Sequence, residues 1–106
     1  MKNGLRNDIL NTLNHKEVHH ILISSPVCTN WIEQEDLEKF TVDDCSEKNG
    51  GDINIFVYYN GVEVLAINGT EEELKDQVSI LRNEKEISVR YDINSNCMVD
   101  ITLTLK

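Results

Sequence analysis

The sequence lacks several features that mark whole classes of protein. In 106 residues it has one proline, and its longest unbroken apolar runs are only a few residues long. Such short runs exclude a membrane-spanning helix. The chain has three cysteines, at Cys28, Cys45 and Cys97. Their odd number and wide spacing argue against a disulfide framework or a CxxC site. We therefore expect reduced thiols.

Basic residues are also scarce. Ten Lys and Arg oppose 19 Asp and Glu, so the net charge is −9 and the isoelectric point is near 4.6. Nucleic acid and anionic membranes repel such a chain, and we expect neither as a direct partner. A basic protein is the partner that the charge favours. The polar N-terminal stretch has no apolar run of signal-peptide length, which predicts a cytoplasmic protein.

Motifs for metal binding are absent from the histidine-rich stretch HKEVHH. If this stretch were helical, His15 and His19 would share a face and could hold zinc. However, Glu17 stands one residue away from the place of the glutamate in an HExxH motif. His19 and His20 alternate faces if they belong to a strand. We expect no metal site here.

Signals for nucleophilic catalysis are equally weak. Ser24 and Ser25 have no glycine elbow, and Cys28 has no basic neighbour in the sequence. We expect no catalytic residues and no cofactor. A small enzyme that pairs His19 or His20 with a cysteine remains the alternative.

Hydrophobic periodicity predicts a single α+β domain over residues 1–106. Leu5, Ile9 and Leu13 form one apolar stripe, which indicates a helix over residues 4–14. The stretch VHHILIS, residues 18–24, is short and β-branched, as in a buried strand.

A short helix is predicted to begin at Trp31. Asn30 and Glu33 have the spacing of a capping box, and Leu37 and Phe40 would lie on the inner face of this helix.

The clearest local signal is a β-hairpin. Residues 53–59 and 62–68 flank Asn60-Gly61, the pair that a type I′ turn favours because both residues accept positive φ. This turn predicts the pairs Tyr59 with Val62, Val57 with Val64, and Phe56 with Leu65.

A second capping box, Thr70 with Glu73, predicts a helix whose inner stripe is Leu74, Val78 and Leu81. Two alternating strands follow at residues 86–93 and 97–106, joined by a turn at 94–96. The predicted order is α-β-(α)-β-β-α-β-β. It describes a largely antiparallel sheet of four to five strands with two or three helices on one face.

The negative charge is concentrated in residues 31–52, WIEQEDLEKFTVDDCSEKNGGD. This segment has eight acidic and two basic residues, a net charge of −6. The only tryptophan stands at its edge, and aromatic anchors ringed by charge are typical of protein interfaces. The predicted partner-binding residues are Trp31, Glu33, Glu35, Asp36, Glu38, Phe40, Asp43, Asp44, Glu47 and Asp52. The competing interpretation is a solvated, solubilising face, with Trp31 as part of the core.

A small acidic chain with such a segment resembles the immunity proteins of bacterial contact-dependent growth inhibition and colicin-type systems. The resemblance lies in size, charge and the aromatic residues of the acidic segment. It implies an antitoxin that binds a basic nuclease toxin, foremost an RNase, and occludes its active cleft. One alternative is a phosphate-mimicking inhibitor of a host or phage nucleic-acid-binding enzyme, and another is a small enzyme.

Overall fold

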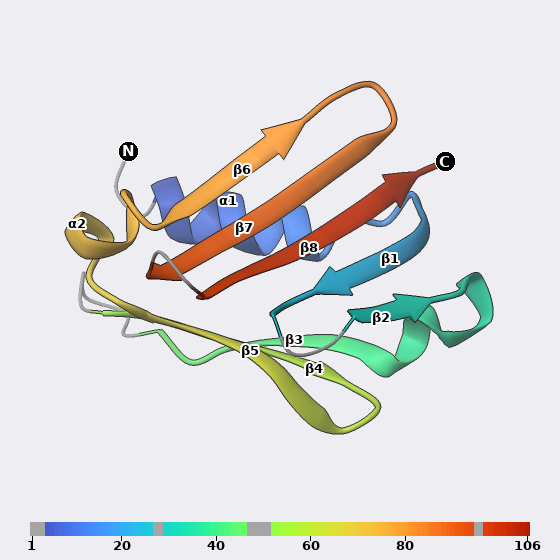
Figure 1. The fold of residues 1–106 in the computed structure, drawn as a ribbon, viewed down its shortest axis with the longest axis horizontal. Helices are drawn as coiled ribbons and strands as arrows, with labels where there is room; N and C mark the ends of the chain where they lie inside the picture. The colour runs from blue at the N-terminus through green and yellow to red at the C-terminus, as the bar shows by residue number, and fades with distance from the viewer. Residues whose placement is uncertain (1–3, 27–28, 47–51, 95–96) are drawn as a thin grey trace.

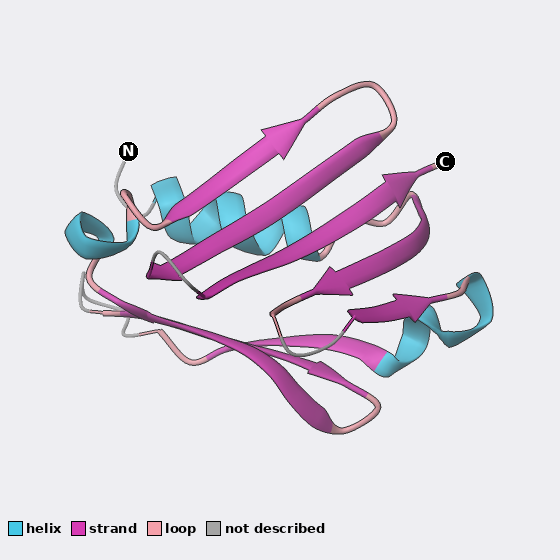
Figure 2. Ribbon diagram, viewed as in Figure 1, coloured by secondary structure: helices cyan, strands magenta, loops and turns pink. Residues whose placement is uncertain are grey.

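The chain forms two antiparallel sheets and three helical segments in the computed structural model, which describes residues 4–26, 29–46, 52–94 and 97–106 (Figure 1). The elements are α1 Gly4–Leu13, β1 Val18–Ser24, β2 Thr29–Ile32, η1 Gln34–Lys39, β3 Phe40–Asp44, β4 Ile53–Tyr59, β5 Val62–Gly69, α2 Glu71–Leu74, β6 Val78–Arg82, β7 Glu86–Asn94 and β8 Cys97–Leu105. The α+β class and the antiparallel pairing predicted from the sequence are confirmed (Figure 2). Within the described ranges, no helix is long and apolar enough to cross a membrane.

The larger sheet has five strands in the order β2-β1-β8-β7-β6. Every neighbouring pair in it is antiparallel. The last strand of the chain, β8, lies at the centre because it pairs with both β1 and β7. The turn predicted at 94–96 falls partly on residues 95–96, which lie outside the described residues. Asn94, predicted to belong to this turn, is instead the last residue of β7 and pairs with Cys97.

The smaller sheet has three strands in the order β3-β4-β5 and contains the predicted hairpin. Asn60 has φ +56° and Gly61 has φ +80°, the positive values that a type I′ turn requires. Tyr59 pairs with Val62, as predicted.

Beyond the turn, the predicted register is wrong by one residue. Val57 pairs with Leu65 and not Val64, and Phe56 pairs with Ala66 and not Leu65. Val64 is an extra residue in β5, a β-bulge, and a shift of one residue turns the side chains that follow to the opposite face. The buried side chains of this sheet are therefore Ile53, Ile55, Val57, Leu65 and Ile67.

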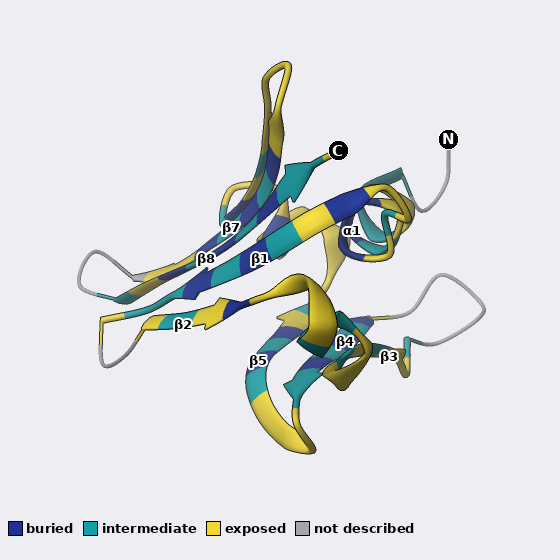
Figure 3. Cartoon of the chain, turned by 90° about the vertical axis from the view of Figure 1, so that its right-hand side faces the viewer, coloured by how far each residue is buried: buried dark blue, intermediate teal, exposed yellow. Residues whose placement is uncertain are grey.

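One hydrophobic core joins α1 to both sheets (Figure 3). As predicted, Ile9 and Leu13 are buried and Leu5 packs against the core. The helix contacts both β7 and β3, so it bridges the two sheets. Burying an isoleucine or leucine contributes about 1.5–3 kcal/mol, which makes this cluster the main source of stability. The largest fully buried side chains are Ile9, Ile32, Ile55, Ile67, Leu74, Ile101, Leu103, Val57 and Val89.

The helix predicted after Thr70 begins correctly but ends too late. The capping box is present, with Thr70 Oγ1 accepting the N–H of Glu73 at 3.2 Å and Glu73 Oε1 accepting the N–H of Thr70 at 2.9 Å. The helix is a single turn that ends at Leu74, and residues 78–82 form the edge strand β6. The spacing of Leu74, Val78 and Leu81 predicted a helix. In the structure, residues 78–82 instead form their backbone hydrogen bonds with β7.

The helix predicted to begin at Trp31 is wrong. Residues 29–32 are the strand β2, and only a 3-10 helix, η1, follows. Its N-cap residue Glu33 makes no side-chain cap hydrogen bond. Residues 40–44, hidden in the acidic segment, are a further strand, β3. This strand completes the second sheet. The prediction placed only helices on one face of the main sheet, whereas that face carries both α1 and the second sheet.

Candidate partner-binding surface

The acidic segment connects the two sheets. It starts in β2 of the five-stranded sheet, continues through η1 and enters the three-stranded sheet as β3. The predicted contact residues consequently lie in different regions of the molecule. Glu47 falls outside the residues that the structure describes.

Trp31 lies on the exposed side of β2, opposite Leu22 of β1. Its side chain is 50% exposed, whereas its neighbour Ile32 is fully buried, so the isoleucine fills the core in its place. The indole Nε1 donates to Glu33 Oε2 at 2.6 Å, and the ring centroid lies 4.3 Å from that of His20. Trp31 is thus both accessible and held in place.

Exposed carboxylates follow Trp31 directly. Glu33, Glu35 and Glu38 are exposed, in or beside η1. No ion pair joins any of these three to a basic side chain in the described ranges. The chain therefore presents unneutralised negative charge at the end of β2.

The remaining charged groups of η1 interact within the helix. Lys39 Nζ lies 3.2 Å from Asp36 Oδ1. The hydrogen bond to Asp36, followed by the charge of that carboxylate, raises the pKa of Lys39. Leu37 packs against the core and attaches η1 to the rest of the fold.

Phe40 and Asp44, both predicted to contact a partner, also make contacts within the chain. Phe40 pairs with Tyr59 and packs against the core. Asp44 forms an ion pair with Arg6 of α1 and accepts the N–H of Ser46 at 3.1 Å. Burial alone would raise the pKa of the Asp44 carboxyl, but hydrogen bonds from Arg6 and Ser46 outweigh this and lower it.

Asp43 and Asp52 are exposed but belong to the three-stranded sheet. Asp43 pairs with Phe56 on β4, and Asp52 immediately precedes that strand. The structure therefore separates them from the carboxylates at β2. The residues that it brings together are Trp31, Glu33, Glu35, Asp36 and Glu38.

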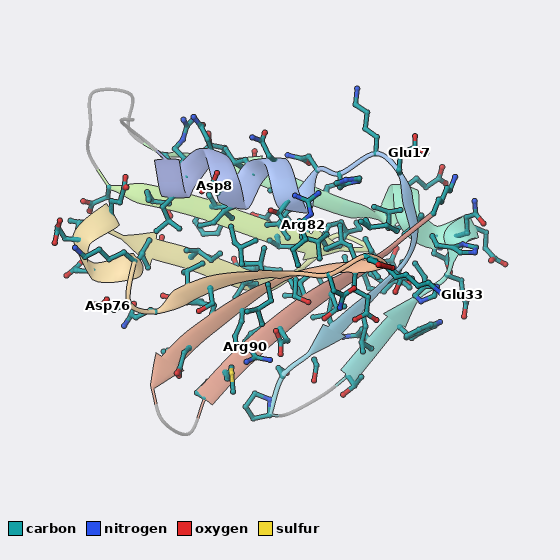
Figure 4. All side chains as sticks on the ribbon, turned by 90° about the horizontal axis from the view of Figure 1, so that it is seen from above. Asp8, Glu17, Glu33, Asp76, Arg82 and Arg90 are labelled. Carbon is teal, nitrogen blue, oxygen red and sulfur yellow. The ribbon has the colours of Figure 1, made fainter. Side chains whose placement is uncertain are left out.

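Sequence reasoning missed the outer face of the five-stranded sheet. Leu81 and Met98 are 44% and 43% exposed on it. Arg90 and Asp100 form an ion pair of 3.2 Å across β7 and β8, on the side away from α1 (Figure 4). Strand alternation separates an inner from an outer face, but it does not show that the described residues place no further layer on the outer one.

Two pockets adjoin α1. One, of about 240 Å³, lies between α1, β1 and η1, and includes Leu37 and Phe40 in its lining. The other, of about 340 Å³, lies between α1 and β6, where Asp8 and Arg82 line it. His15 lines both pockets. Neither lining contains a Ser or Cys, the residues that nucleophilic catalysis most often pairs with a histidine.

The histidines of HKEVHH diverge in the structure. His15 follows α1, and its Nδ1 accepts the N–H of Glu17 at 3.2 Å. His19 is the extra residue of a bulge in β1, and His20 packs its ring against Trp31. In the part of the chain that the structure describes, no three His, Cys, Asp or Glu residues are grouped to hold a metal ion.

Comparison of the chain with protein-family models, curated proteins and solved structures finds no match.

Proposed function

We propose that the chain is an immunity-type inhibitor that binds a basic nuclease toxin and occludes its active cleft. The observation that carries this proposal is the group of exposed, unpaired carboxylates at η1 beside the half-exposed Trp31. The rest of the chain carries the same sign of charge, with a net charge of −9 for the whole.

The mechanism is occlusion and not chemistry. Nucleases bind phosphates with basic side chains, and carboxylates at η1 can occupy the same positions. Long-range attraction would speed association to as much as about 10⁸–10⁹ M⁻¹s⁻¹ at low salt. Because this attraction is screened, the association rate should fall steeply as salt is added.

The test uses the protein encoded by the gene directly upstream, where a toxin is expected. The double variant Glu35→Lys with Glu38→Lys changes two exposed carboxylates that have no internal partner. Its matched control is Glu71→Lys with Asp76→Lys, at the α2 end of the molecule (Figure 4). Each replacement changes the charge by two, so both variants move from −9 to −5.

We expect association with the upstream protein to slow at least tenfold for the η1 variant and to change much less for the α2 control. Equal rates in both variants would show that net charge alone steers binding and that η1 is not the contact. If the unmodified chain neither binds the upstream protein nor inhibits its nuclease activity, the proposed function is wrong.

A further inference from the structure

The helices and strands of the described residues cover one face of the five-stranded sheet. Seen along the sheet, α1 and the three-stranded sheet lie on one side of β1, β7 and β8 (Figure 3). No helix or strand formed by the described residues lies on the other side, here called the outer face. An antiparallel sheet can leave one face to water, so the case for a contact surface depends on which side chains this face exposes.

Strand register arranges the outer face in rows. Leu22 lies opposite Trp31 on one side and Thr102 on the other, and Ser88 then lies between Thr102 and Leu81. One row thus runs across all five strands, with large apolar side chains at both ends. Trp31 and Leu81 are 50% and 44% exposed, although both belong to strands.

The polar groups in the middle of this face are already paired. The hydroxyls of Ser88 and Thr102 lie 3.0 Å apart, and Arg90 forms its ion pair with Asp100 in the next row. A buried polar group is costly mainly when it has no hydrogen-bond partner. The desolvation free energy that a partner must overcome to cover these four groups is therefore smaller than for polar groups without a hydrogen-bond partner.

The side chain of Trp31 is already ordered in the unbound chain, as suits a residue that anchors a partner. Its hydrogen bond to Glu33 and its contact with His20 restrict the indole before any partner arrives. A side chain that is already ordered loses less entropy on binding, and tryptophan is among the residues that dominate binding energies.

The charges around this face favour a basic occupant. Glu33, Glu86 and Asp92 are exposed near its borders, and none forms an ion pair with a described basic residue. Arg90, the cation of the central rows, is neutralised by Asp100. A second copy of the chain would add another net charge of −9 and be repelled.

We infer that the outer face of the five-stranded sheet is the contact surface for the basic toxin, with Trp31 as its anchor and the carboxylates of η1 as its charged rim. This inference rests on the proposed function and extends it, because it places most of the buried area on β1, β7 and β8. The toxin would then present an apolar pocket bordered by Lys or Arg.

The test measures how much the exposed apolar side chains of the outer face contribute to affinity. Trp31→Ala and Leu81→Thr remove exposed apolar groups from the outer face, while Val62→Thr removes one that is 65% exposed on the other sheet. Against the upstream-encoded protein, we expect Trp31→Ala to raise Kd by roughly tenfold or more through faster dissociation, with a smaller rise for Leu81→Thr. Val62→Thr should leave Kd unchanged.

A measurement on the unmodified chain tests the same surface without the risk that a variant fails to fold. Trp31 is the only tryptophan of the chain. After the partner's own fluorescence is subtracted, the emission of Trp31 should shift to shorter wavelength on binding. Acrylamide should also quench it less in the complex. If the unmodified chain binds but neither this change nor the effect of Leu81→Thr is seen, the outer face is not the contact and the proposed function still stands. Absence of binding by the unmodified chain would overturn both. Self-association that is lost in Trp31→Ala would identify a second copy as the occupant and overturn the inference.

Discussion

Arg6 and Asp44 are 38 residues apart in the sequence and form an ion pair that joins α1 to β3. This contact links the helix to a strand of the smaller sheet, at the opposite end of β3 from η1. It gives one of the predicted contact carboxylates a partner within the chain, although Asp44 remains exposed. It also makes stability depend on the protonation of Asp44.

The folded protein should lose stability in acid partly through Asp44. Its pKa is lowered on folding from an ordinary value of 3.8, so its contribution is present above that value and is lost as the pH falls through the folded pKa. We expect Asp44→Asn to cost up to about 1 kcal/mol at pH 7 and to make urea stability less dependent on pH below about 5. Asp43→Asn is the control, and an Asp44→Asn protein with the unmodified pH dependence would contradict the assignment.

Gly61→Ala should destabilise the hairpin. Gly61 has φ +80°, and a Cβ added at this position would meet no other atom within 4 Å, so the cost is the backbone conformation alone. We expect a loss of about 1–2 kcal/mol in urea unfolding. Asn60→Gly keeps both turn residues compatible with positive φ and should change stability by much less. A Gly61→Ala protein as stable as the unmodified chain would exclude the type I′ turn.

The cap of α2 should be measurable despite the shortness of that helix. Thr70→Ala removes the acceptor of the Glu73 N–H, and we expect a loss of about 1 kcal/mol in urea unfolding. Thr70→Ser retains a hydroxyl and should recover most of that loss. Equal losses in the two variants would mean that the methyl group, and not the hydroxyl, is responsible.

Quenching of Trp31 fluorescence should report its surroundings without a partner. Because the indole is half exposed, neutral acrylamide should quench it readily. Iodide should quench it less, since Glu33 and the carboxylates of η1 repel an anion. The difference should shrink near 1 M salt, where the screening length is about 3 Å. Glu33→Gln should raise quenching by iodide alone; equal quenching by both agents at low salt would refute the charged environment.

The sequence predicted those parts of the fold whose signals are local. The turn at Asn60-Gly61 and the cap at Thr70 depend on a few adjacent residues, and both are confirmed. The register beyond the turn depends on the bulge at Val64, which alternation of apolar residues cannot reveal. Residues 78–82 have apolar spacing that fits either a helix or a strand, and only the neighbouring β7 decides between them.

The candidate site was predicted in part for the same reason. The charge of residues 31–52 is visible in the sequence, and so is the single tryptophan. The packing of Phe40 against the core and the ion pair of Asp44 with Arg6 depend on the place of β3 beside β4, which the acidic composition concealed. The outer face consists of side chains from five strands, and its existence depends on the strand order.

The central position of β8 has a consequence for how the chain reaches its fold. Val18 of β1 pairs with Leu105 of β8, so most of the chain separates two strands that must meet. Until β8 inserts between them, β1 and β7 each retain an unpaired edge. Such non-local pairing makes folding slow, on the order of milliseconds to seconds, and exposed strand edges can pair with other chains. The step at which this protein is most prone to aggregate is therefore the insertion of its last strand.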